Sequence, residues 1–157
     1  MASRLVPTFY DSDKDKKQMS LEGATFTAGN IVAQTAAMDA VVAAIQAVCL
    51  SKIIHEQQWA NFNEEEAFPY TPPTNKFAQN MLKGIMTMRD ATTGIEFNKP
   101  IYGIDLAQFT DTDAKGNWAL PLGSGAGATL KTSIEAYAKH PDSGNAVVLV
   151  RVVHADE

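Results

Sequence analysis

The chain has little of what disulfide-rich or metal-binding proteins depend on. Its 157 residues contain a single cysteine, Cys49, which excludes an internal disulfide and a cysteine-rich zinc site. The three histidines have no metal-ligand spacing, and we expect no catalytic residues, cofactor or metal. Lysine and arginine number 13 against 18 aspartates and glutamates. Because no basic patch is present, nucleic acid is not an expected partner.

The sequence also lacks the apolar core of a signal peptide. Its first 30 residues hold Pro7 and a run of charges. We therefore expect synthesis in the cytoplasm without a cleaved signal peptide. With 45% apolar and 20% charged residues, the composition is that of a globular protein, and the length predicts a single domain, residues 1–157.

The most apolar stretch is Ala28–Leu50, which carries one charge, Asp39. On a helical wheel at about 100° per residue it has two apolar faces and a narrow polar stripe. The bulky face consists of Ile31, Met38, Val41, Val42, Ile45, Val48 and Cys49. The alanine face consists of Ala33, Ala36, Ala37, Ala40, Ala43, Ala44 and Ala47.

The two faces predict different contacts. We expect the bulky face to cover the chain's own sheet, with Cys49 as a small buried hydrophobe. The alanine face lets another backbone approach, because no atom projects beyond Cβ. It is predicted to meet a second helix, within this chain or in a neighbouring subunit. The alternative is that these alanines only supply helix propensity on a solvent-facing surface.

A membrane span is disfavoured for the same stretch, although its length is sufficient. Asn30, Gln34, Asp39 and Gln46 are costly in lipid, and no cluster of lysine or arginine flanks the stretch. We therefore predict no membrane span.

Alternating apolar patterns predict an α+β fold. Residues 1–18 are expected to form a strand or arm and a charged turn, with Pro7 restricting the strand to a sheet edge. Further strands are predicted at Met19–Phe26, Lys52–Phe62, Lys76–Asp90, Ile95–Leu106 and Ala146–Val153, and a second helix at Thr129–His140. This order contains a ferredoxin-like β-α-β-β-α-β core, an antiparallel sheet with two helices on one face. No internal repeat is evident.

Residues 63–75 form an acidic, proline-rich loop that is too long for a simple hairpin connection. Phe68 and Tyr70 are framed by prolines within it. These two aromatic residues either anchor the loop into another subunit or hold it as a strap over the chain's own sheet. The sequence leaves both interpretations open.

The charged turn near the N-terminus contains Asp11, Asp13 and Asp15 at the spacing of calcium ligands. A calcium loop needs glycine at its sixth position, where this chain has Lys16. A solvated turn is therefore the favoured interpretation.

The glycine-rich segment 123–127 precedes Lys131 and Thr132, an order similar to that of a phosphate loop. A phosphate loop needs glycine directly before the lysine, and Leu130 stands there instead. A flexible glycine connection is therefore favoured over a phosphate site.

The pattern from Leu21 to Val153, with its alanine-rich first helix, resembles small uncharacterised structural proteins of bacterial viruses. The resemblance implies a homomeric shell or fibre and transfers no functional residues. We therefore expect a self-assembling structural protein, a subunit of a viral or filamentous particle whose partner is itself, in a virion or extracellular assembly. The predicted interface comprises Ala33, Ala36, Ala37, Ala40, Ala44, Ala47, Phe68 and Tyr70.

Two alternatives remain. The first is a small ferredoxin-like oligomeric enzyme or ligand-binding protein, for which His55, Trp59 and Tyr102 are the expected pocket residues. The second is a regulatory or adaptor domain. The fold alone does not decide among these classes.

Overall fold

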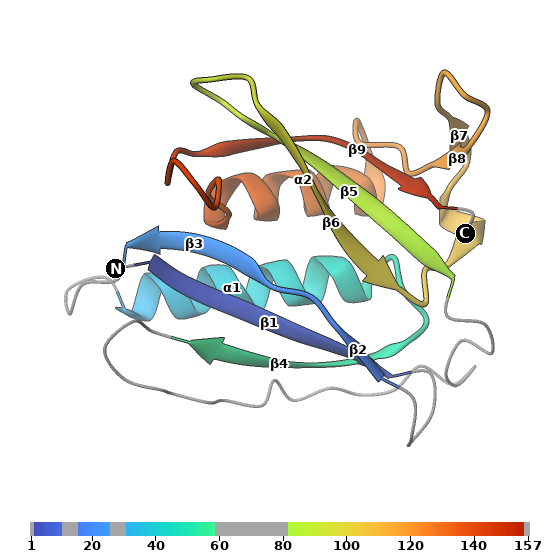
Figure 1. Cartoon of the computed structure of the whole chain (residues 1–157). Coiled ribbons are helices and arrows are strands. Elements are labelled where there is room, and N and C mark those ends of the chain that lie inside the picture. Colours follow the sequence, from blue (N-terminus) through green and yellow to red (C-terminus); the bar gives the residue numbers. More distant parts are fainter. Residues whose placement is uncertain (1, 11–15, 26–30, 59–81, 156–157) are drawn as a thin grey trace.

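The computed structural model describes residues 2–10, 16–25, 31–58 and 82–155. These residues form two antiparallel sheets, with two α-helices between them (Figure 1). The first sheet contains β1 (Ala2–Tyr10), β2 (Lys16–Gln18), β3 (Leu21–Thr25) and β4 (Lys52–Gln58). The second contains β5 (Lys83–Asp90), β6 (Glu96–Tyr102), β7 (Asp111–Thr112), β8 (Trp118–Ala119) and β9 (Val147–His154). The helices are α1 (Ile31–Gln46) and α2 (Gly125–Tyr137).

The predicted α+β class is confirmed, and the predicted element order is close to the observed one. The single ferredoxin-like sheet is not observed in the described residues, because the strands divide between two sheets. The first has β1 at its centre, and the second has the strand order β6-β5-β9-β8-β7. None of the helices that the described residues form is long and apolar enough to cross a membrane.

The same ββαβ topology occurs twice in the chain. In the first half, β1 forms a hairpin with the β2–β3 stretch, α1 follows, and β4 returns antiparallel to β1. In the second half, β5 and β6 form the hairpin, α2 follows after the short inserted strands β7 and β8, and β9 returns antiparallel to β5. The two helices pack against each other between the halves (Figure 1). The structure therefore contains an internal repeat that the sequence does not reveal.

Pro7 lies in the middle of a central strand, so the predicted edge position for β1 is wrong. β1 is paired with β4 on one side and with β2 and β3 on the other. The Pro7 carbonyl accepts the Met19 amide at 3.2 Å, but proline has no N–H to return a second bond. The missing bond explains why the strand facing β1 is interrupted between Gln18 and Leu21.

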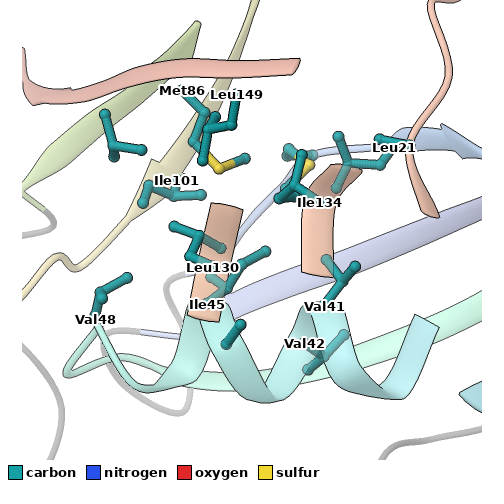
Figure 2. Packing of buried hydrophobic residues seen from close by; sticks show 14 of the residues in the cluster. Leu21, Val41, Val42, Ile45, Val48, Met86, Ile101, Leu130, Ile134 and Leu149 are labelled. Carbon is teal, nitrogen blue, oxygen red and sulfur yellow. The ribbon is translucent and has the colours of Figure 1, made fainter. Parts of the chain in front are cut away.

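The core lies between the sheets and around the helices (Figure 2). The bulky face of α1 is buried as predicted, with Met38, Val41 and Ile45 each 0% exposed. Cys49 is also buried, and burial raises the pKa of its thiol. Buried side chains from α2 and both sheets complete the cluster, among them Leu21, Met86, Ile101, Leu130, Ile134 and Leu149. Burying each such side chain contributes roughly 1.5–3 kcal/mol.

Candidate functional site

The solvent-facing side of α1, extended by the residue that follows it, consists mainly of alanines. Ala33, Ala36, Ala40, Ala43 and Ala47 are all exposed, and we call this set the alanine seam. Their spacing alternates between three and four residues, which is the repeat of the contact positions in a coiled coil. A surface helix normally carries charged or polar side chains on this side. The seam therefore has the pattern of a helix–helix contact without a partner helix from the described part of this chain covering it.

Polar side chains lie beside the seam rather than on it. The Gln46 amide donates to the carbonyl oxygens of Cys49 at 3.1 Å and Ser51 at 2.9 Å, so it closes the C-terminal end of the helix. Asp39 is partly buried, and this desolvation raises the pKa of its carboxyl group. The seam itself offers only methyl groups to a partner.

Two of the predicted interface alanines do not belong to the seam. Ala44 is 2% exposed and lies in the chain's own core, and Ala37 is partly buried against it. On the helical wheel both residues lie on the side of the alanine face that adjoins Val41 and Val48, so the fold covers them. Ala44 is therefore unavailable to a second subunit. Phe68 and Tyr70, the other two predicted interface residues, lie outside the described residues.

Further apolar residues lie beyond both ends of the seam. At the N-terminal end Val32 is 80% exposed, although its place in the sequence pattern gives no sign of this. At the C-terminal end the Gln108 amide donates to the Ala47 carbonyl at 3.2 Å, which brings the 3₁₀ turn at Leu106–Gln108 against α1. A hollow of about 470 Å³ adjoins this turn and is lined by Leu106, Ala107, Phe109, Thr110 and the half-exposed Trp118.

The fold also brings together a serine, a histidine and an aspartate. The Ser143 hydroxyl donates to Asp90 Oδ2 at 2.6 Å, and His140 Nδ1 accepts the backbone amides of Asp142 at 3.2 Å and Ser143 at 3.3 Å. In a hydrolase triad the serine donates to histidine, and histidine donates to aspartate. The bonds here connect one turn to another, so this cluster is structural.

The glycine-rich segment does not form a phosphate loop. Gly125 and Gly127 belong to α2 itself, so the expected flexible connection is wrong for them. A Cβ on Gly127 would overlap the Pro121 carbonyl oxygen, which shows that glycine is needed here for close packing. The Lys131 ammonium is paired with Glu135 and directed to the Leu149 carbonyl at 3.3 Å, away from the start of the helix.

The same pair fixes the backbone of β9. The Leu149 amide donates to Glu135 Oε2 at 3.0 Å, while its carbonyl accepts from Lys131. The described pairing of β9 with β8 is confined to Ala119 and Val153. Side chains of α2 thus satisfy both backbone groups of Leu149 on the side of β9 that faces away from β5, where no described strand pairs with them.

Of the three residues proposed for a ligand pocket, only the side chain of Tyr102 lies in the described part of the chain. The Tyr102 ring packs edge-on against the Phe9 ring, with 5.6 Å between the ring centroids, and the Lys17 ammonium lies over its face. Because Phe9 and Lys17 belong to the first sheet, Tyr102 takes part in the contact between the two sheets. Trp59 and the side chain of His55 lie outside the described residues, as do the three aspartates of the candidate calcium turn at 11–15.

Within the described ranges, no group of three or more histidines, cysteines or carboxylates is placed to hold a metal ion.

Comparison with protein-family models, with curated proteins and with solved structures finds no match to this chain.

Proposed function

We propose that the protein is a self-assembling structural protein, a subunit of a homomeric viral or filamentous particle. The observation that supports the proposal is the alanine seam, an uncharged helix face with coiled-coil spacing that is exposed in the single chain. Methyl groups allow two helix axes to approach closely, and hydrogen-bonding groups are kept beside the seam. The partner that fits this surface is a helix with the same small side chains.

A second copy of α1 has that surface. A contact in which the same patch is used by both subunits is self-complementary across a two-fold axis. In an antiparallel pair centred on Ala40, Ala33 of one copy meets Ala47 of the other. Such an arrangement places the exposed Val32 of one subunit near the apolar hollow beside Gln108 of its neighbour.

The seam alone is small for a stable interface. From Ala33 to Ala47 it extends about 21 Å along the helix. Stable interfaces bury about 800 Å² per partner. The contact must therefore include the surface around Val32 and the hollow at Trp118, and assembly must use further contacts to extend beyond a pair.

A charge in the seam tests the proposal. Ala40→Asp places a carboxylate at the centre of the contact, whereas Ala136→Asp places one on an exposed alanine of α2 outside the seam. Light scattering with size-exclusion chromatography and negative-stain microscopy should show assemblies for the wild type and Ala136→Asp, and monomers for Ala40→Asp. Equal assembly of both variants, or a monomeric wild type at all concentrations, would reject the proposal.

A further inference from the structure

A groove of about 470 Å³ lies on the face of the second sheet that is turned away from the helices. Its floor contains Ile85 of β5 and Val153 of β9, and the turn between β7 and β8 forms one wall. On β5 the groove-lining Ile85 and Thr87 alternate with Met86 and Met88, which face the core. The size is that of a small-molecule site.

A β-bulge places Arg151 in this groove. Thr87 is paired with Arg151 and Met88 with Leu149, which leaves Val150 as an extra residue in β9. Strict alternation from the buried Leu149 would direct Arg151 into the core. The bulge instead brings the Arg151 side chain to the outer face, where the side chain is 46% exposed.

The guanidinium of Arg151 retains donors for a ligand. Among the described residues it forms an ion pair with Glu96 at 3.8 Å, a separation beyond hydrogen-bond distance, so this pair uses none of its N–H donors. Glu96 is held by Arg89, which donates twice to it at 2.7 and 3.2 Å. The hydrogen bonds from Arg89 are also the main cause of the lowered pKa of Glu96.

Asn98 is oriented as a donor by a buried threonine. Thr87 is 3% exposed, and its hydroxyl donates to Asn98 Oδ1 at 2.9 Å. Because the amide oxygen is used in this bond, the Asn98 NH₂ group is the part left for a ligand. Thr87 is thus a positioning residue for the groove.

The wall of the groove is a turn stabilised by its own aspartate. Asp113 accepts the amides of Lys115 at 2.9 Å and Asn117 at 2.8 Å, and also the Asn117 side chain at 3.2 Å. These bonds, that of the Asn117 amide first, lower the pKa of Asp113. Both oxygens of Asp113 therefore accept hydrogen bonds within the turn, and the exposed Lys115 adds a cation to the rim of the groove.

We propose that this groove binds a small organic oxyanion, with a carboxylate or phosphate head group held by Arg151, Lys115 and Asn98. Guanidinium matches both head groups by two parallel hydrogen bonds. The carbon body of the ligand lies over Ile85 and Val153. The proposal is independent of self-assembly, since the groove and the alanine seam share no residue.

Saturation-transfer NMR tests the proposal, because it observes the ligand and works for assembled protein of any size. The probes are benzoate, phenyl phosphate and the neutral benzamide. Both anions should give saturable signals with dissociation constants of about 1 mM, and benzamide should bind at least about tenfold more weakly. The tighter of the two anions identifies the head group.

Variants assign the binding to the groove. Arg151→Gln should raise the dissociation constant of benzoate at least about tenfold, and Lys115→Gln should raise it several-fold. Lys83→Gln, which removes a charge from β5 outside the groove, should change it less than about twofold. Thermal unfolding checks that each variant is folded. Binding of benzamide equal to that of benzoate, or unchanged binding in folded Arg151→Gln and Lys115→Gln, overturns the proposal.

Discussion

Ser143 donates a hydrogen bond of 2.6 Å to Asp90, although the two residues lie 53 positions apart. Asp90 also accepts the amides of Thr92 at 2.8 Å and Thr93 at 3.1 Å, and the Asn145 side chain at 3.3 Å. One buried carboxylate thus connects the turn of the β5–β6 hairpin to the turn that follows α2.

This arrangement predicts a pH dependence of stability. The Ser143 bond, followed by the backbone bonds, lowers the pKa of Asp90 below its usual range. A carboxyl with a lowered folded-state pKa stabilises the protein above its unfolded pKa, near 4, and loses this effect as the pH falls further. The difference in melting temperature between wild type and Asp90→Asn should therefore be larger at pH 7 than at pH 3.

Asp142→Asn is the control, since Asp142 is exposed in the same turn. It should leave the melting temperature nearly unchanged at both pH values. If the wild type and Asp90→Asn differed equally at pH 7 and pH 3, the assignment of Asp90 as an ionised connector would be wrong.

The close packing of Gly127 against Pro121 predicts that a larger side chain at position 127 lowers stability. Gly127→Ala introduces a methyl group where the Pro121 carbonyl lies against α2. Overpacking of this kind costs about 1–3 kcal/mol or more. Gly123→Ala is the matched control, because a Cβ there meets no atom within 4 Å. Urea unfolding should show a large loss for Gly127→Ala and little change for Gly123→Ala, and similar midpoints for both would contradict the packing argument.

The hydrogen bond from the Leu149 amide to Glu135 should protect this amide of β9 from hydrogen exchange. Glu135→Leu removes the acceptor of the Leu149 amide, whereas Glu135→Gln keeps a side-chain oxygen at this position. Losing the bond should cost roughly 1 kcal/mol. Hydrogen exchange at Leu149 should be faster in Glu135→Leu than in the wild type and intermediate in Glu135→Gln. Unchanged exchange in Glu135→Leu would show that the side chain does not protect this edge.

The sequence predicted the helices and strands because the apolar periodicity of a segment depends only on the residues within that segment. The run around Val41 and Ile45 predicted the buried face of α1, and the run at Ala146–Val153 predicted the strand that the structure shows at Val147–His154. Pairing between distant strands leaves no local signal, so the sequence did not reveal two sheets or the repeated ββαβ unit. The interruption at Met19 depends on Pro7 across the sheet, which local reasoning about an edge strand missed.

The candidate sites show the same limit. Helical periodicity predicted the alanine face, but only packing shows that Ala44 belongs to the core and that Ala43 is exposed. Alternation along β9 gave no reason to single out Arg151, because a bulge at Val150 changes the face on which it lies. The residues of the groove are far apart in the sequence, and only the fold brings them together.

Cysteine cross-linking across the seam tests the central claim most directly. A pair of α1 helices packed through alanines brings position 40 of two copies close together, within reach of a disulfide, which needs Cα atoms about 4.4–6.8 Å apart. The native Cys49 is buried and does not compete. Under mild oxidation Ala40→Cys should form disulfide-linked dimers, and Ala136→Cys should not. Monomers from both variants, or equal dimer formation by both, would contradict assembly through the alanine seam.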